Sequence, residues 1–313
     1  MCGVVGLLIK DPALEPRLGS LLVPMIEALG DRGPDSSGIA VYSDGAAGGS
    51  GPLATLAGAE VRISLGSDAP VDWPSVRADL ERRFSPVATV SELPRGLLVG
   101  APMRHAAEIQ VHLGDQWPEV RVLATGGAVA VIKDTGRPEE TCSRHALSEW
   151  QGYLAVAHTR MATESAVTLL HSHPFVPAAD LCVVHNGSFS NYASVRRWLS
   201  SQGVRFDSDN DSEVAARLLA ERLAAGDDLA EATRWVMKEL DGFFTLVITT
   251  ATGMSVVRDA FACKPAAVAE ADGYVAVASE YRALAHLPGI AHARVFEPRP
   301  EEVYTWTRST ATS

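Results

Sequence analysis

The chain has 313 residues and a mass of 33.2 kDa, enough to bury a sizeable core in one large domain or two small ones. Its 38 aspartates and glutamates outnumber its 27 lysines and arginines, which gives a formal net charge of −11. This charge disfavours sequence-independent binding to phosphate backbones and anionic membranes, so we expect no nucleic acid and no membrane among its partners.

The chain shows no membrane or export signal. No stretch of about 18 uninterrupted apolar residues occurs, and the first apolar run lacks a basic leader and ends at Lys10 and Asp11. We therefore expect a cytoplasmic protein. The four cysteines form no C-x-x-C pair, so we expect free thiols, no metal site and no cofactor.

The first sixty residues predict a strand, a helix, a loop and a second strand. Residues 3–10 are apolar and β-branched enough for a buried strand. Asp11 and Pro12 then supply an N-cap and a first-turn proline for a helix through about Leu29. Glycines and a proline end that helix in the segment 30–38, and residues 39–43 predict the second strand.

The segment from about 44 to 150 has the weakest sequence signals for secondary structure and function. It opens with a stretch rich in glycine and alanine, typical of a flexible loop or an insertion boundary. Short apolar runs then alternate with polar helical stretches. We assign no site to this segment.

The second half of the chain predicts buried strands that end in polar residues, and amphipathic helices between them. Strands, then helices, then strands again favour two sheets sandwiched by helices over a doubly wound parallel sheet. The predicted strands are 153–159, 181–187, 243–250, 254–259 and 274–279, and the predicted helices are 191–203, 211–226 and 228–240.

Cys2 is the first candidate for chemistry. Aminopeptidase normally removes the initiator methionine before a small residue, and Cys2 would then carry a free α-amine with a pKa of about 7.7–8.0. That amine is a general base next to a strong nucleophile. The alternative is a cysteine that only packs in the first strand.

Two motifs at strand ends offer groups for substrate binding. Arg160, just beyond a buried strand, can hold a carboxylate through two hydrogen bonds, or it can form a surface ion pair. Asn186 and Gly187 place a side-chain amide and a backbone N–H side by side, which suits an oxyanion hole. An ordinary Asn-Gly turn explains the same residues.

Carboxylates cluster at the start of the predicted helix 211–226. Capping of the first helical N–H groups explains one residue of the segment 209–212. It does not explain all of them, so an additional carboxylate in this segment could bind the ammonium group of a ligand, although a solvated acidic helix start is the plainer interpretation.

In their joint order these motifs resemble the class II glutamine amidotransferases, whose glutaminase domain belongs to the N-terminal nucleophile hydrolases. The resemblance implies an α+β fold, a four-layer αββα sandwich of two mainly antiparallel sheets, in a single domain 1–313 with an elaborated insertion at about 44–150. It is carried by "MCGVVG" (1–6), "DRGPDSSG" (31–38), "HTRMATES" (158–165), "HSHPF" (171–175), "HNGSFSN" (185–191), "NDSE" (210–213) and "LDGFFTLVI" (240–248).

The resemblance also implies roles for individual residues. Cys2 would attack the side-chain amide of L-glutamine, and Asn186 and Gly187 would hold the oxyanion. The substrate-binding residues would be Arg160 for the α-carboxylate, Asp211 for the α-ammonium group, and also Arg32, Thr163 and His185. Arg32 would in addition help to hold the region of the terminal cysteine.

The resemblance is greatest to stand-alone amidotransferase subunits related to the amino-terminal domain of glutamate synthase, including the one that belongs to N-methylglutamate synthase. It implies separate synthase subunits that bear flavin or iron–sulfur groups. Two other functions stay open: an N-terminal cysteine hydrolase acting on a different amide, and a non-enzymatic subunit that binds glutamine or glutamate.

Overall fold

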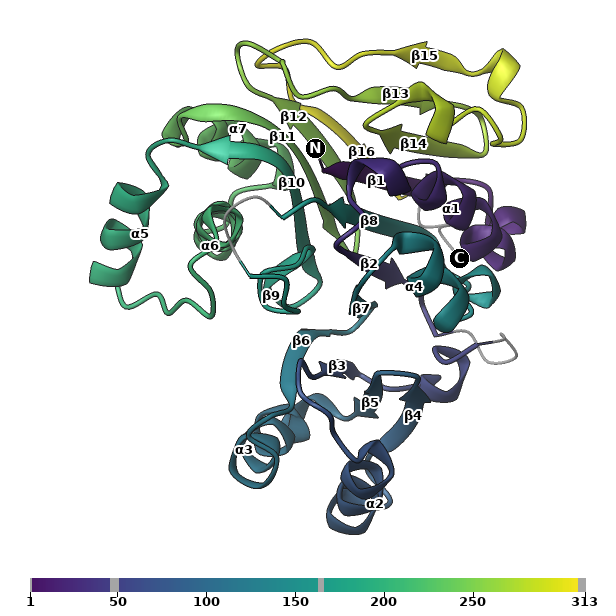
Figure 1. Ribbon diagram of the computed structural model, residues 1–313, viewed down its shortest axis with the longest axis vertical. Helices are drawn as coiled ribbons and strands as arrows, with labels where there is room; N and C mark the ends of the chain where they lie inside the picture. The colour runs from purple at the N-terminus through teal and green to yellow at the C-terminus, as the bar shows by residue number, and fades with distance from the viewer. Residues whose placement is uncertain (1, 46–50, 163–165, 309–313) are drawn as a thin grey trace.

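The computed structural model describes residues 2–45, 51–162 and 166–308. These residues form three antiparallel β-sheets and the helices that cover them (Figure 1). Two sheets stack face to face and make up the larger body, and the third sheet forms a smaller unit beside it.

The larger body is built around a seven-stranded sheet in the order β15-β13-β14-β1-β8-β2-β7. Strand β1 lies at its centre, antiparallel to β8 and β14, and all seven of its residues are buried. The strands are β1 (Gly3–Ile9), β2 (Ser36–Tyr42), β7 (Val129–Thr135), β8 (Leu154–Arg160), β13 (Ala267–Glu270), β14 (Tyr274–Ala278) and β15 (Arg294–Phe296).

The second sheet of this body has five strands in the order β16-β12-β11-β10-β9. Its long hairpin pairs Cys182 through Phe189 with Thr249 through Gly242. The strands are β9 (Phe175–Ala178), β10 (Leu181–Phe189), β11 (Gly242–Thr250), β12 (Gly253–Arg258) and β16 (Tyr304–Thr307).

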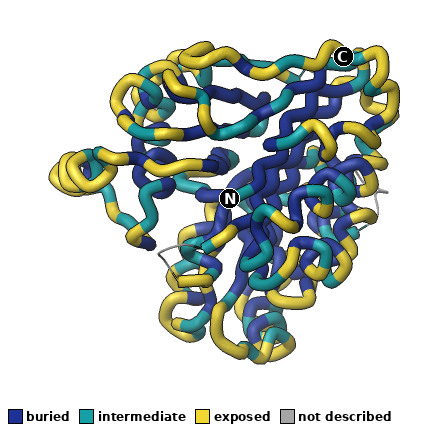
Figure 2. The backbone as a smooth tube through the Cα atoms, turned by 45° about the horizontal axis from the view of Figure 1, so that its top comes forward, coloured by how far each residue is buried: buried dark blue, intermediate teal, exposed yellow. Residues whose placement is uncertain are grey.

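Helices cover the outer faces of both sheets. Because side chains alternate along a strand, Val4 and Leu8 of β1 face the second sheet and pack with Val247. Val5 and Leu7 face the opposite way, toward the first helix layer. Buried strands accordingly fill the centre of Figure 2. The first layer contains α1 (Leu18–Glu27) and α4 (Pro138–Arg144), and the second contains α5 (Tyr192–Ser201), α6 (Asp211–Ala224) and α7 (Leu229–Glu239).

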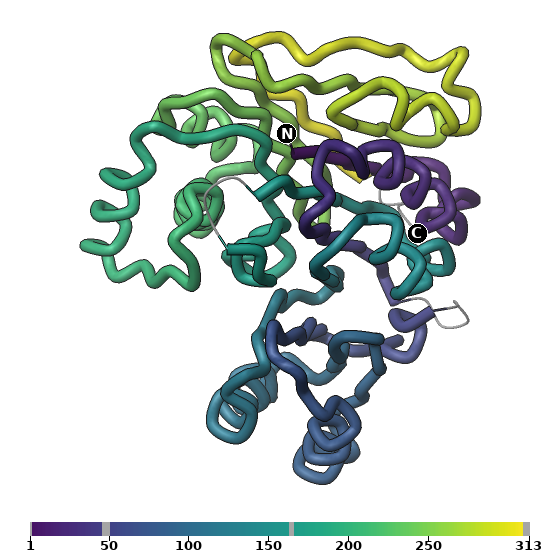
Figure 3. Tube along the Cα trace, in the orientation of Figure 1, coloured from purple at the N-terminus to yellow at the C-terminus, as the bar shows by residue number. Residues whose placement is uncertain are grey.

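This arrangement is a four-layer αββα sandwich and confirms the fold class expected from the sequence. The smaller unit has its own sheet, in the order β4-β5-β3-β6, and its own apolar core. The chain enters it before β3 and leaves it after β6 (Figure 3). Its elements are β3 (Val61–Gly66), α2 (Trp73–Phe84), β4 (Thr89–Leu93), β5 (Gly96–Ala101), α3 (Ala106–Gln116) and β6 (Arg121–Gly126).

Two element boundaries differ from the sequence prediction. The helix expected from Asp11 to Leu29 is divided into η1 (Pro12–Arg17) and α1, and Pro16, which has no backbone N–H to donate, lies next to the boundary. Strand β2 starts at Ser36, inside the predicted loop, where Ser36 pairs with both Arg160 and Thr135. The 3-10 helices are η1 (Pro12–Arg17), η2 (Gly30–Arg32), η3 (Ala54–Leu56), η4 (Met103–His105), η5 (Leu147–Glu149), η6 (Tyr281–Ala283) and η7 (Ile290–His292).

The helices of the described part of the chain include none that is both long and apolar enough to cross a membrane.

Candidate active site

Cys2 lies at the edge of the site, directly before β1. Gly3 pairs with Thr159 of β8, so the antiparallel register sets Cys2 beside Arg160. The Cys2 Sγ is partly exposed and lies 3.9 Å from the carbonyl oxygen of Met161. The register of one strand pair thus brings together two groups that are 158 positions apart in the sequence.

Arg32 holds the backbone of Cys2. Its Nε donates to the Cys2 carbonyl oxygen at 3.0 Å, and its Nη1 pairs with Glu280 Oε1 at 2.6 Å. The hydrogen bond from Arg32 lowers the pKa of Glu280, so this carboxylate is charged when it meets the guanidinium. The sequence analysis singled out Arg32 but not Glu280, which lies 248 positions away.

Arg160 ends strand β8 and is 5% exposed. Its Nη1 donates to the carbonyl oxygen of Ala166 at 2.8 Å. Burial lowers the pKa of its guanidinium, although Cys2 and Asp35 act in the opposite direction. A guanidinium keeps its charge despite such a shift, so Arg160 presents a cation next to Cys2.

Asp35 holds the segment that follows Arg160, and the sequence analysis did not identify it. Its Oδ2 accepts from the backbone N–H of Ala162 at 2.7 Å, and its backbone N–H donates to the Arg160 carbonyl oxygen at 3.0 Å. Gly33 of the same loop runs so close to β8 that a Cβ there would lie 2.2 Å from the Thr159 carbonyl carbon. The loop therefore braces the end of β8.

Asn186 and Gly187 are consecutive residues of β10 in the second sheet. Since Cys182 and Val184 pack between the sheets, alternation directs Asn186 to the same side, toward β1 and β8. Asn186 is 3% exposed, and its Nδ2 is buried without a hydrogen-bond partner among the described residues. A buried amide donor left unpaired is costly, and this one is available for a ligand oxygen.

Gly187 occupies a position that only glycine fits. Its φ is +151°, and a Cβ would lie 1.9 Å from the Phe243 carbonyl oxygen. A side chain there would push β10 away from β11. The glycine therefore lets the backbone next to Asn186 approach its neighbour closely.

Asp211 is the first residue of α6 but does not cap the helix. Asn210 is the N-cap and accepts from the Ser212 N–H at 2.9 Å. Asp211 Oδ2 instead accepts from the backbone N–H of Phe189 at 2.9 Å, which ties α6 to the end of β10. Its side chain is 22% exposed, so the carboxylate is held in place and can still be reached by a ligand.

His185 lies behind these groups. Its ring stacks on Phe189 with centroids 4.2 Å apart, and its Nδ1 lies 2.7 Å from Ser212 Oγ and 3.9 Å from Asp211 Oδ1. Burial lowers the pKa of His185 to about 4. The imidazole is thus neutral and faces α6, where it can orient Asp211.

Two more buried histidines join His185 in a cluster that the sequence analysis did not identify as such. The rings of His158 and His173 lie 4.0 Å apart, and His158 Nε2 lies 3.0 Å from the His185 carbonyl oxygen. Burial lowers the pKa of His158 to about 3 and that of His173 well below its usual value. The "HSHPF" motif held a sign of this cluster, since it carries His173.

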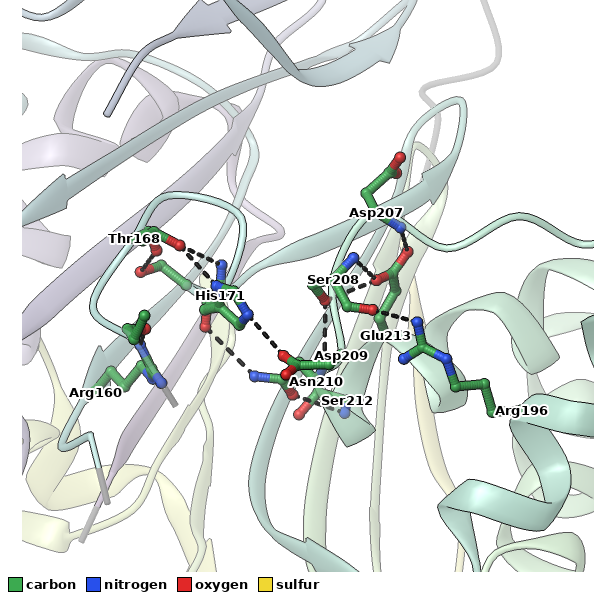
Figure 4. Close-up of polar contacts among 12 residues, drawn as sticks. Arg160, Thr168, His171, Arg196, Asp207, Ser208, Asp209, Asn210, Ser212 and Glu213 are labelled. Carbon is green, nitrogen blue, oxygen red and sulfur yellow. Dashed lines mark hydrogen bonds and ion pairs between the residues drawn. The ribbon is translucent and has the colours of Figure 1, made fainter. Parts of the chain in front are cut away.

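The segment between Arg160 and β9 connects the two sides of the site. His171 Nε2 lies 2.7 Å from Asp209 Oδ1, and its carbonyl oxygen accepts from Asn210 Nδ2 at 3.5 Å. Figure 4 shows His171 between Arg160 and the start of α6. Thr163, expected to bind substrate, lies outside the described residues.

The site thus offers a thiol, a buried cation, a fixed carboxylate and an unpaired amide donor. This set matches the requirements of an amide substrate that carries both an α-carboxylate and an α-ammonium group. Among the described residues, no group of three or more histidines, cysteines, aspartates and glutamates is arranged to hold a metal ion.

Comparison with known proteins identifies the family. A family model described as "Glutamine amidotransferase domain" matches residues 158–286. The glutamine amidotransferase-like protein GlxB of Rhizobium meliloti (strain 1021) is 41% identical over 312 residues, which cover 99% of this chain and 100% of that protein. A putative glutamine amidotransferase of Methanothermobacter thermautotrophicus is 31% identical over 318 residues, 97% of this chain and 99% of that protein.

Two solved structures share the fold. The glutamine phosphoribosylpyrophosphate amidotransferase from B. subtilis, complexed with ADP and GMP, aligns with a TM-score of 0.59 at 18% identity over 99% of this chain. A structure described as the allosteric regulatory enzyme of purine biosynthesis aligns with a TM-score of 0.61 at 18% identity over 97% of it. The chain spans 50% and 46% of their respective lengths.

The chain therefore belongs to the glutamine amidotransferase family. It is a class II amidotransferase with the fold of the N-terminal nucleophile hydrolases.

Proposed function

We propose that the chain hydrolyses L-glutamine to glutamate and ammonia through Cys2. The observation that carries the proposal is the position of the Cys2 thiol beside the Arg160 guanidinium, with the unpaired Asn186 amide directed from the facing sheet toward the same strands. One experiment tests the whole proposal: ammonia release from L-glutamine by the purified chain, compared with release from L-asparagine, whose amide is one methylene nearer to the α-carbon.

In the proposed mechanism Cys2 becomes the first residue after removal of Met1. Its α-amine takes the thiol proton, and the Sγ attacks the amide carbon of glutamine. The C–N bond of the resulting tetrahedral intermediate breaks, and the α-ammonium returns the proton to the leaving ammonia. Water then hydrolyses the thioester, which releases glutamate and regenerates the thiol.

The remaining groups bind the substrate. Arg160 holds the α-carboxylate and Asp211 holds the α-ammonium group, while Asn186 Nδ2 and the Gly187 N–H stabilise the oxyanion. We assign His185 a positioning role, because its contacts are to Ser212 and Asp211. Thr163 is retained as a further substrate contact on the strength of the sequence motif alone.

Replacing Asn186 with alanine tests the oxyanion hole. Loss of one such donor costs about 10²- to 10³-fold in kcat, so we expect Asn186→Ala to lower kcat for glutamine hydrolysis by this factor while KM changes little. The measurement is steady-state ammonia release at saturating glutamine. Gln202→Ala, which removes an exposed amide at the end of α5, is the matched control, and a kcat within twofold of wild type for Asn186→Ala would exclude the role.

Replacing Asp211 with asparagine tests ammonium binding. An asparagine oxygen can still accept from the Phe189 N–H, whereas the charge is lost, so we expect KM for glutamine to rise about 10- to 100-fold, the equivalent of one charged hydrogen bond. The test substrate is glutaramate, which lacks the α-amine. Wild type should discriminate strongly against glutaramate and Asp211→Asn should not. Glu221→Gln, on an exposed part of α6, serves as the control, and unchanged discrimination in Asp211→Asn would refute the assignment.

We further propose that the ammonia passes to a separate synthase subunit of the glutamate synthase type, as in N-methylglutamate synthase. The support is the order and spacing of the sequence motifs. The test is to mix the chain with purified subunits of such a synthase and supply [amide-¹⁵N]glutamine in excess unlabelled ammonium. Product that retains the ¹⁵N label would support transfer between the subunits, and product diluted to the bulk isotope ratio would contradict it.

A further inference from the structure

A second cleft lies between the smaller unit and the larger body. It runs between the edge strands β6 and β9 and past α6, and its volume is about 750 Å³. A recess of about 60 Å³ adjoins it and shares Leu170, Val176, Asp207 and Arg217 with it. None of the described residues assigned to glutamine chemistry lines this cleft.

The recess contains a buried lysine. Lys133 lies near the end of β7, 7% exposed, on the side of the strand that faces the second sheet, as Val129 and Val131 do. Burial lowers the pKa of its ammonium to about 8. Among the described residues it has one hydrogen-bond acceptor, the Leu169 carbonyl oxygen at 3.1 Å, and it lies 5.5 Å from the centre of the Phe175 ring.

The carboxylates around the recess already have partners. Glu213 accepts hydrogen bonds from the Asp207 and Ser208 N–H groups and from the Ser208 hydroxyl, as Figure 4 shows in part. Arg217 bridges Glu213 and Asp207 at 3.1 and 2.7 Å. Asp68 Oδ1 accepts from the Leu169 N–H. Each of these carboxylates is thus engaged by Arg217 or by backbone N–H groups.

Two cations of the cleft are incompletely paired among the described residues. Lys133 retains donors that no described residue satisfies, and Arg121 of the edge strand β6 is exposed at the rim with no ion pair among the described residues. A buried ammonium with incomplete hydrogen bonding is costly to keep in a fold, and it is well placed to receive an anion.

We propose that this cleft binds a small organic carboxylate, with a carboxylate on Lys133 and its apolar part against Leu170, Phe175 and Val176. These three residues line the recess, and apolar walls around a few polar groups are typical of small-molecule sites. Arg121 at the rim suits a second anionic group, which makes a dicarboxylate the natural probe.

One wall of the cleft is formed by the segment 166–171, which also contacts residues beside the proposed glutamine site. Leu169, which contacts Lys133, lies between Ala166, the partner of Arg160, and His171, the partner of Asp209. A carboxylate bound to the remaining donors of Lys133 would lie beside the Leu169 carbonyl oxygen, which accepts from the same ammonium. Binding in the cleft therefore acts on residues adjacent to the substrate groups.

The test measures binding in the full chain carrying Cys2→Ala, so that its outcome does not depend on glutaminase activity. Lys133 is acetylated with an N-hydroxysuccinimide ester and the rate is followed by peptide mass spectrometry, with exposed Lys238 as internal control. Succinate at four times its Kd, measured by calorimetric titration, should slow acetylation of Lys133 about fivefold and leave Lys238 unchanged. Neutral succinamide should have no effect.

Variants separate the site from a general effect of anions. Arg121→Gln should weaken succinate binding and Lys133→Met should abolish it, whereas Arg104→Gln, an exposed arginine outside the cleft, should not change it. The proposal is overturned if calorimetry detects no succinate binding, if succinamide protects equally, if inorganic phosphate protects as well as succinate, or if Lys133→Met binds succinate like wild type.

Discussion

Replacing Cys2 with alanine is expected to lower kcat for glutamine hydrolysis by about 10⁴-fold or more, the scale on which enzymes lose activity with their nucleophile. The Cys2 side chain is partly exposed, and among the described residues its Sγ has one long hydrogen-bond contact, at 3.9 Å, to the Met161 carbonyl oxygen. The substitution therefore removes the nucleophile with little effect on packing. The measurement is ammonia release, monitored at saturating glutamine.

Two comparisons make this result specific. Cys263→Ala removes another exposed thiol and should leave kcat unchanged. The Cys2→Ala protein should still bind glutamine in calorimetric titration, because Arg160 and Asp211 remain. A Cys2→Ala variant that keeps a tenth of the wild-type activity would show that another group attacks the amide.

Acidification from pH 7 to pH 5 is expected to destabilise the fold steeply. His158, His173 and His185 are buried, and their pKa values in the folded state lie below the usual value of 6.5. In the window from about pH 6.5 down to about pH 4 the unfolded chain therefore binds more protons than the folded chain. Each histidine then lowers the free energy of unfolding by about 1.4 kcal/mol per pH unit.

Urea denaturation at several pH values measures this dependence. His173→Leu removes a group whose ring nitrogens have no hydrogen-bond partner among the described residues, so the variant should fold and should reduce the pH slope by about a third. His292→Gln, at an exposed position, should not change it. A wild-type slope no steeper than that of His173→Leu would contradict the assignment of buried, neutral histidines.

Long apolar strands made most of the fold predictable. Strands β1 and β8 are buried along their whole length, and β10 and β11 each contain a continuous buried run. Helices α6 and α7 between β10 and β11 have side-chain N-caps. The short strands β9, β13, β15 and β16 were not predicted. Each has only three or four residues, too few for a periodic pattern, and each is defined by its partner strand.

The sheet in segment 61–126 was also not predicted. Its strands are short and its helices are mostly polar, so its sequence pattern alone did not predict a four-stranded sheet with its own core. Long-range pairing of β3 with β5 and β6 stabilises this unit. A local pattern carries no information on such pairing.

The site could be anticipated where a motif ends a strand. Cys2, Arg160 and Asn186 follow from their positions at or near the ends of buried strands, because strand ends place side chains at the edge of a sheet. Glu280, Asp35 and the contacts of His173 could not be anticipated. Their partners are distant in the sequence, and no local feature distinguishes a bracing carboxylate from a solvated one.

One measurement tests the central claim most directly: the mass of the amino-terminal peptide after the purified chain reacts with 6-diazo-5-oxo-norleucine, a glutamine analogue that alkylates an attacking thiol. The mechanism predicts a peptide that starts at Cys2 and carries the label, with protection by glutamine but not by asparagine. A peptide that retains Met1, or a label on another cysteine while Cys2 stays unmodified, would contradict it.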